Sequence, residues 1–198
     1  MRIWSDIVAV EQFTSTCIEP VSIKFRHRSL MNNILESIAH YLEDHRLKLV
    51  TAESCTAGMV ASTLADVPGC GSWLECAFVT YSADAKVYCL GVRRETIERF
   101  NLTSEQVACE MAEGALRASR ANVAVADTGL AGPTNGDSDI PVGTVCFAWS
   151  FEEKGAVTTF SETRHFDGDR NEVREAATNY VIHRIWHYHN ELEQRRAR

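Results

Sequence analysis

Four consecutive residues carry groups that could do chemistry. Glu53, Ser54, Cys55 and Thr56 follow the apolar segment 47–50 and precede a run of small residues. This order predicts a strand, a tight turn and the N-terminus of a helix, with hydroxyl and thiol groups at the junction. Free backbone N–H groups and the positive end of the helix dipole make such a junction suitable for an anion or an oxyanion. Ser54 is a candidate nucleophile, although a serine at this position often serves only as a helix cap.

Lys86 is the residue best placed to act as a base toward this turn. It lies five residues after Tyr81, in a predicted helix that follows the strand 76–81, so its amine can reach back toward the strand end. Burial or a neighbouring cation would lower the lysine pKa from about 10.4 and increase the neutral form. Spacing alone is also compatible with a solvated surface lysine. None of the seven histidines falls at a predicted strand end among turn-forming residues, so a histidine-based triad is not favoured.

Two further segments could hold an anionic group. The loop 128–136, which contains Thr128, is rich in glycine and hydroxyl groups and follows a buried strand, and such loops let backbone N–H groups approach phosphate. It matches neither a P-loop nor a dinucleotide fingerprint, so use of ATP or a dinucleotide is not supported. Arg170 opens the last predicted helix and could hold a phosphate or carboxylate through two hydrogen bonds. Arg170 and Arg174 together would equally suit a solvated helix face.

The elements around these residues alternate between strand and helix. Strands are predicted at 47–52, 76–81, 123–126, 143–151 and 156–164, and helices at 31–46, 55–66, 82–90, 104–119 and from 169 onward. The last two strands predict an antiparallel hairpin. The order predicts an α/β fold, a three-layer α/β/α sandwich with a mixed, mostly parallel sheet. Ligands bind beyond the carboxyl ends of such strands, so we expect Ser54, Tyr81 and Thr128 to converge there.

The composition is that of an ordinary soluble enzyme. The chain has 198 residues and a formal net charge of −7, which argues against non-specific binding of nucleic acid. No apolar run approaches the ~20 residues of a membrane span, and the first residues do not resemble a secretion signal. The seven cysteines are scattered without a C-x-x-C pair, which favours reduced thiols over disulfides or a zinc site. We therefore expect a cytoplasmic protein without a metal.

The chain divides into three segments of unequal size. Residues 1–30 have no clear period, and we interpret them as an extension that is disordered or a misassigned start, with translation beginning at Met31. Residues 31–192 form the predicted domain, and 193–198 a solvated tail that frays from Glu191. Thr103 with Gln106, and Asp169 with Glu172, resemble capping boxes at helix starts. Apolar and aromatic residues on the last helix would suit either the core or a homo-oligomer interface; they include Ile185, Trp186 and Tyr188.

Five ordered segments between about residues 31 and 192 resemble the CinA C-terminal domain family. They are AESCTAG at 52–58, FVTYSADAK at 78–86, TGLAGP at 128–133, PVGTV at 141–145 and FDGDR at 166–170. The chain departs from the family pattern at Ala57, where a glycine is usual, and in the glycine loop. The resemblance implies a stand-alone amidohydrolase of pyridine nucleotide salvage that needs no cofactor. It would hydrolyse the carboxamide of nicotinamide mononucleotide to nicotinate mononucleotide and ammonia.

The resemblance also assigns roles to residues. Ser54 would be the nucleophile and Lys86 its base, while Tyr81, Thr128 and Arg170 would support catalysis and orient the substrate. The residues that would bind the nucleotide substrate are Glu53, Cys55, Thr56, Gly129 and Gly132. Backbone N–H groups at the start of the predicted helix 55–66 would form the oxyanion site.

Two other interpretations use the same residues. Cys55 is intrinsically more nucleophilic than serine, and Glu53, Lys86 and Cys55 together resemble the arrangement of nitrilase-type amidases. The chain could also be a catalytically silent module that binds a nucleotide or a partner protein.

Overall fold

The computed structural model describes residues 34–135 and 139–197, and those from Leu35 onward form one compact unit. The predictions about residues 1–30 lie outside the described residues. After a helix at 34–44, the elements are β1 (Leu49–Glu53), α3 (Met59–Ala65), the short 3₁₀ helix η2 (Cys70–Ser72), β2 (Leu74–Val79), α4 (Ala83–Leu90), α5 (Arg94–Phe100), α6 (Glu105–Arg117), β3 (Val123–Gly129), β4 (Thr144–Glu153), β5 (Ala156–His165) and α7 (Arg170–Arg196). None of the described helices is long and apolar enough to cross a membrane.

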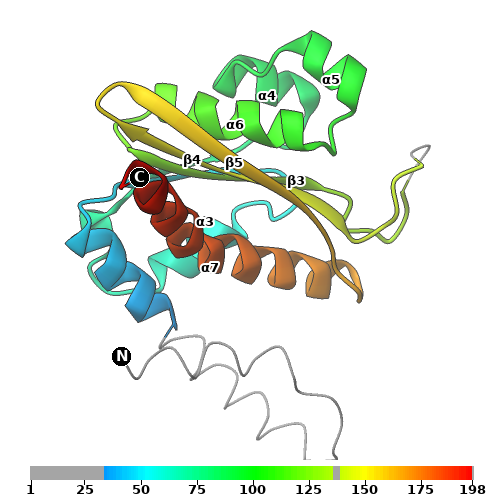
Figure 1. The fold of residues 1–198 in the computed structure, drawn as a ribbon. Helices are drawn as coiled ribbons and strands as arrows, with labels where there is room; N and C mark the ends of the chain where they lie inside the picture. The colour runs from blue at the N-terminus through cyan, green and yellow to red at the C-terminus, as the bar shows by residue number, and fades with distance from the viewer. Residues whose placement is uncertain (1–33, 136–138, 198) are drawn as a thin grey trace, which may run out of the picture. The chain divides into compact units, whose positions relative to one another are not determined.

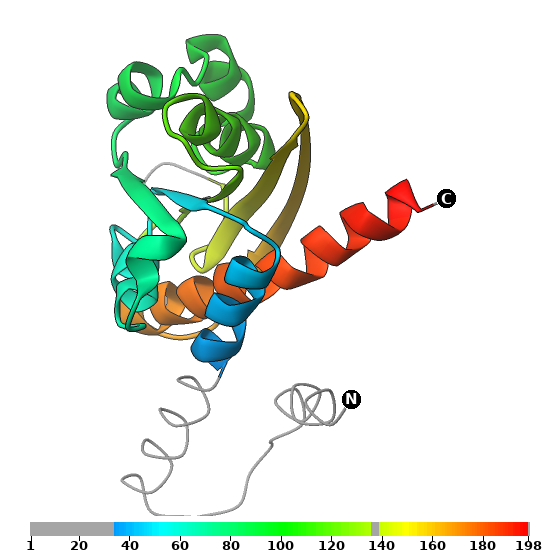
Figure 2. The same ribbon diagram turned by 90° about the vertical axis from the view of Figure 1, so that its left-hand side faces the viewer.

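The five strands form one mixed sheet in the order β2-β1-β3-β4-β5. Strand β1 pairs in parallel with both β2 and β3, while β4 is antiparallel to both of its neighbours. Four of the five strands therefore share one direction, which confirms the predicted mixed, mostly parallel sheet. Helices α4, α5 and α6 lie on one side of the sheet and α3 and α7 on the other (Figures 1 and 2), so the three-layer sandwich is also confirmed.

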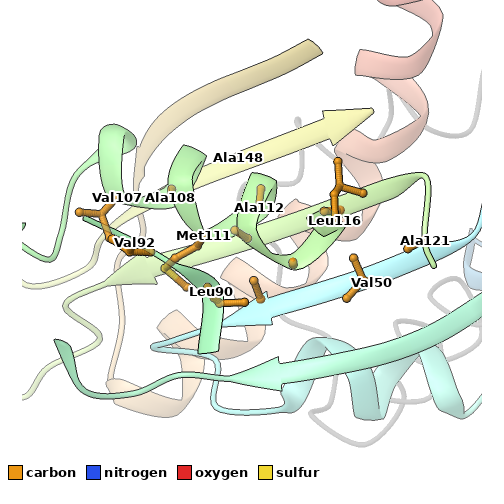
Figure 3. Close-up of a cluster of buried hydrophobic side chains, with 14 of the residues drawn as sticks. Val50, Leu90, Val92, Val107, Ala108, Met111, Ala112, Leu116, Ala121 and Ala148 are labelled. Carbon is orange, nitrogen blue, oxygen red and sulfur yellow. The ribbon is translucent and has the colours of Figure 1, made fainter. Parts of the chain in front are cut away.

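Helix α6 packs its buried face directly on the sheet. Val107, Met111 and Ala112 are fully buried in a cluster that also contains Val50 from β1 and Leu90 from α4 (Figure 3). Many side chains of this face are small, including several alanines, so the helix backbone can approach both the strands and α4 closely. This packing holds α4, which carries Lys86, against α6.

One helix start and one whole helix differ from the prediction. Ser104, and not Thr103, caps α6, because its hydroxyl accepts a hydrogen bond from the backbone N–H of Val107. Helix α5 was not predicted; it is short and mostly charged, and Arg93 just before it pairs with Glu110 of α6. A helix held by such contacts on the surface leaves little apolar periodicity in its sequence.

The start of helix α7 agrees with the prediction, but its end does not. Its capping box of Asp169 and Glu172 is confirmed. The predicted fraying from Glu191 is wrong, because α7 continues to Arg196. The guanidinium of Arg196 donates to the carboxylates of Glu153 and Glu193, which ties the last turn to the end of β4.

Gly114 allows the close approach of α6 to α4. A Cβ atom at this position would lie 2.0 Å from the carbonyl oxygen of Leu90. We therefore expect Gly114→Ala to lower the free energy of unfolding by about 1–3 kcal/mol, despite the higher helix propensity of alanine. Urea denaturation measures this change. Gly71→Ala is the matched control, because a Cβ atom there meets no atom within 4 Å. An unchanged or increased stability of the Gly114 variant would contradict the close contact.

Candidate active site

The turn after β1 is longer than the sequence predicted. A helix was expected from Cys55, but α3 begins only at Met59. Ala57 and Gly58 both have left-handed backbone conformations, with φ of 52° and 90°, which a continuous right-handed helix cannot include. Residues 54–58 therefore form an irregular turn that presents Ser54 at the end of β1 and separates it from the helix.

The carboxylate of Glu53 occupies the N-terminus of α3. It accepts hydrogen bonds from the backbone N–H groups of Gly58, Val60 and Ala61, at 2.7, 3.1 and 2.9 Å. The side chain is only 1% exposed. These three N–H groups are therefore not available to an oxyanion, because an internal anion already uses them. The Glu53 side chain holds the turn and does not line a cavity.

Asp127, at the carboxyl end of β3, holds the other side of the turn. Its Oδ1 accepts from the backbone N–H groups of Ser54 and Thr56, at 3.3 and 3.1 Å, and from the thiol of Cys55 at 3.1 Å. The hydroxyl of Thr56, which is fully buried, lies within hydrogen-bond distance of both acidic side chains. Burial raises the pKa of Asp127. No role was predicted for Asp127, which the pairing of β1 with β3 brings to the turn.

Lys86 and Ser54 form the central contact of the site. The Nζ of Lys86 lies 2.9 Å from the Oγ of Ser54. The lysine is fully buried, and burial lowers its pKa to about 8. The structure thus confirms that Lys86 reaches back to the strand end, and it excludes the solvated surface lysine. A lysine with this pKa is neutral in a substantial fraction of molecules near neutral pH.

Backbone carbonyl groups orient the amine. Lys86 donates to the carbonyl oxygen of Thr80 at 2.6 Å, and that of Tyr81 lies 3.5 Å away. A neutral amine has two hydrogens and one lone pair. With its hydrogens directed at the two carbonyl groups, the lone pair is left to face the hydroxyl of Ser54. The arrangement can therefore take a proton from Ser54.

Two arginines from the first turns of α7 contact the site. Arg174 donates to the carbonyl oxygens of Cys55 and Thr56, at 3.1 and 2.8 Å, so it holds the turn and is not part of a solvated face. Arg170 donates to the carbonyl oxygen of Gly132 at 2.5 Å and to the hydroxyl of Tyr81 at 2.8 Å. Arg170 therefore links the glycine loop to the segment that follows β2.

A cavity of about 250 Å³ opens above the Ser54–Lys86 pair. Eight of the predicted residues line it: Ser54, Cys55, Tyr81, Lys86, Thr128, Gly129, Gly132 and Arg170. Of the six other lining residues, three belong to the predicted loop 128–136 (Leu130, Ala131 and Thr134), and three were not predicted (Asn101, Leu102 and Thr103). The segment 101–103 follows α5, and the hydroxyl of Thr128 donates to the carbonyl oxygen of Leu102 at 2.7 Å. Because α5 was not predicted, the position of the segment 101–103 at the site could not be predicted either.

Cys55 is poorly suited to act as a nucleophile. Its thiol is directed at Asp127, the residue is 4% exposed, and burial raises its pKa well above the ordinary range. A buried thiol next to an acidic group stays protonated and unreactive. The geometry favours Ser54 over Cys55.

Among the described residues, one group of side chains has the spacing of a metal site, and it lies at the end of α7. It consists of Glu153, His189 and Glu193. The guanidinium of Arg196 donates to both carboxylates, so a cationic side chain already offsets part of their negative charge.

Comparison with known proteins identifies relatives over most of the chain. The CinA C-terminal domain profile matches residues 31–188. Nicotinamide-nucleotide amidohydrolase PncC of Shigella flexneri is 42% identical over 158 residues, which cover 80% of this chain and 94% of the relative. The protein of the same name from Escherichia coli K12 is 41% identical, with the same coverage.

Solved structures of related proteins have the same fold. A CinA superfamily protein from Escherichia coli has a TM-score of 0.72 at 36% identity, over 77% of this chain and 86% of the other. The competence/damage inducible protein CihA of Agrobacterium tumefaciens has a TM-score of 0.70 at 39% identity, over 77% and 91% of the two chains. With the profile match and the shared sequence, these similarities show that the chain belongs to the CinA C-terminal domain family.

Proposed function

We propose that the protein hydrolyses the carboxamide of nicotinamide mononucleotide, releasing ammonia and nicotinate mononucleotide, with Ser54 as nucleophile and Lys86 as general base. The observation that carries this proposal is the 2.9 Å contact between Lys86 Nζ and Ser54 Oγ at the cavity floor. The names of the Shigella flexneri and Escherichia coli relatives support the substrate.

The first half-reaction forms an acyl-enzyme. Neutral Lys86 takes the proton from Ser54 as Oγ attacks the carboxamide carbon, so the lysine becomes an ammonium group. When the tetrahedral intermediate collapses, the C–N bond breaks and Lys86 returns the proton to the departing nitrogen, which leaves as ammonia. Lys86 is then neutral again, and the nicotinoyl group is bound to Ser54 as an ester.

The second half-reaction uses water in the place of Ser54. Lys86 takes a proton from the water as its oxygen attacks the ester carbon, and then gives a proton to Ser54 as the C–O bond breaks. Nicotinate mononucleotide leaves, and the starting protonation states are restored. One buried amine thus serves as base and acid in both halves of the reaction.

The phosphate of the substrate would bind between Arg170 and the glycine loop. Arg170 and Thr134 line the cavity at the side of that loop, and a guanidinium can pair with two phosphate oxygens. On binding, Arg170 would exchange its bonds to Gly132 and Tyr81 for bonds to phosphate. Tyr81 and Thr128 would then orient the nucleotide above Ser54.

The first of three predictions from this mechanism concerns Ser54 and Lys86. Ser54→Ala and Lys86→Ala should each lower kcat for ammonia release by about 10³-fold or more, because one removes the nucleophile and the other its base. Cys55→Ala is the matched control and should retain turnover. If Cys55→Ala alone abolishes turnover, the thiol is the nucleophile. Calorimetric binding of nicotinamide mononucleotide without ammonia release by the wild type would identify a silent binding module.

The second prediction concerns pH. Only neutral Lys86 can accept a proton, and its pKa is lowered to about 8, so kcat/KM should rise about tenfold per unit below pH 8 and level off above it. Rates between pH 6.5 and 9.5 avoid most of the titration of the substrate phosphate. Tyr81→Phe is the control, because it should keep the position of this limb. A rate independent of pH over that range would contradict a lysine base.

The third prediction concerns thiol reactivity. Burial and the raised pKa should protect Cys55 from iodoacetamide in the native protein, whereas the exposed Cys89 should be alkylated. Mass spectrometry of digested protein measures both sites in one sample, with Cys89 as the internal control. Alkylation of Cys55 as fast as that of Cys89, with loss of activity, would restore the cysteine mechanism.

A further inference from the structure

Two buried acidic side chains share a single hydroxyl group. The Oγ1 of Thr56 lies 2.8 Å from Oε2 of Glu53 and 2.6 Å from Oδ2 of Asp127. All three residues are at most 1% exposed. A hydroxyl has one hydrogen, so it can donate to only one of these two oxygens. The other contact needs a hydrogen from the acidic side chain itself, since two oxygens without a hydrogen between them repel each other.

The remaining hydrogen bonds indicate which side chain carries that hydrogen. Besides Thr56, Glu53 has four donors: the hydroxyl of Thr51 and three backbone N–H groups, distributed over both of its oxygens. A proton on either oxygen would compete with donors already directed at it. Hydrogen-bond donors on both oxygens are the surroundings that favour an ionised carboxylate.

The two oxygens of Asp127 are in different surroundings. Its Oδ1 accepts from the N–H groups of Ser54 and Thr56 and from the thiol of Cys55. Within the part of the chain that the structure describes, Oδ2 has a hydrogen bond only to Thr56 Oγ1. A carboxylic acid satisfies this pattern fully, because its carbonyl oxygen accepts three bonds and its hydroxyl donates one.

We propose that Asp127 is a neutral carboxylic acid at neutral pH, with its proton on Oδ2 donated to Thr56, whose own hydroxyl donates to the ionised Glu53. Asp127 is then a positioning residue, which holds the Ser54 turn without placing a second negative charge beside it. The burial that raises the pKa of Asp127 agrees with this assignment.

The charged groups around Asp127 make its protonation state matter for Lys86. Glu53 and Lys86 are the charged side chains nearest to it on β1 and α4, Arg174 reaches the same turn from α7, and Cys55 is its thiol neighbour. An ionised Asp127 would raise the pKa of Lys86 through its charge. A neutral acid removes this effect and keeps more of the amine in its basic form, a consequence for catalysis that depends on the proposed function.

Asp127→Asn tests the proposal, because an asparagine can reproduce the neutral acid. Its carbonyl oxygen can accept the three bonds of Oδ1, and its amide can donate to Thr56. Glu53→Gln is the matched control, since it also converts one carboxylate to an amide. It would turn N–H hydrogens toward N–H donors, and we expect it to raise the equilibrium constant for unfolding about 10- to 100-fold. At pH 7, Asp127→Asn should be at least as stable as the wild type.

The decisive measurement is the pH dependence of stability, which does not require activity. An aspartate has a pKa near 3.9 in the unfolded chain, so a protonated Asp127 means that folding takes up a proton at higher pH. Between pH 5 and 7, the unfolding constant of the wild type relative to Asp127→Asn should therefore rise about tenfold per pH unit. A ratio that stays constant over this range would overturn the proposal, because it would show that Asp127 is ionised in the fold.

Two further measurements test the protonation of Asp127, one if Asp127→Asn is active and one if it does not fold. If Asp127→Asn is active, its acid limb in kcat/KM should lie at the same pH as that of the wild type, and a limb displaced to lower pH would show that a negative charge had been removed. If the variant does not fold, carbon-13 NMR of wild-type protein with labelled aspartate carboxyl groups replaces it. One aspartate signal should remain in its protonated position at pH 6.5, and its absence would overturn the proposal.

Discussion

The site depends on keeping the amine of Lys86 out of water. Lowering a lysine pKa from 10.5 to about 8 corresponds to about 3 kcal/mol against the charged form. The fold supplies this by packing α4 against α6, which itself lies on the sheet, and Lys86 is left fully buried beneath the cavity. The carbonyl group of Thr80 then fixes the direction of the amine. The burial that lowers the pKa of Lys86 also makes the folded state less stable, so the two effects oppose each other.

The turn that carries Ser54 is held from three directions. Glu53 pairs with the N-terminus of α3 from within the turn, Asp127 approaches from the neighbouring strand, and Arg174 reaches across from α7. This support compensates for the left-handed conformation of Ala57, which costs about 1–2 kcal/mol in a residue with a Cβ atom. Ala57, which departs from the glycine of the family pattern, is therefore held in this conformation by the surrounding contacts.

Local patterns predicted most of the sheet and most residues of the candidate site, because both depend on properties that short segments carry. Strand ends in a parallel sheet converge, so Ser54, Tyr81 and Thr128 could be placed together before the structure was known. The role of Asp127 could not be predicted, because which backbone groups and side chains its carboxyl group contacts depends on the irregular turn 54–58. The same holds for Asn101, whose position depends on a short charged helix stabilised by tertiary contacts. The features that were not predicted are those that depend on packing between distant parts of the chain.

The arginines of α7 also set the order in which the protein becomes competent. The Ser54 turn lies near the beginning of the described chain, but Arg174, which holds its carbonyl groups, is separated from Cys55 by 119 positions. A ribosome exposes the N-terminal part of a chain first. During synthesis, the sheet strands β1 to β3 can therefore emerge and pair long before α7 arrives to complete the turn. The contacts of Arg174 with the carbonyl groups of Cys55 and Thr56 can therefore form only after α7 has been synthesised.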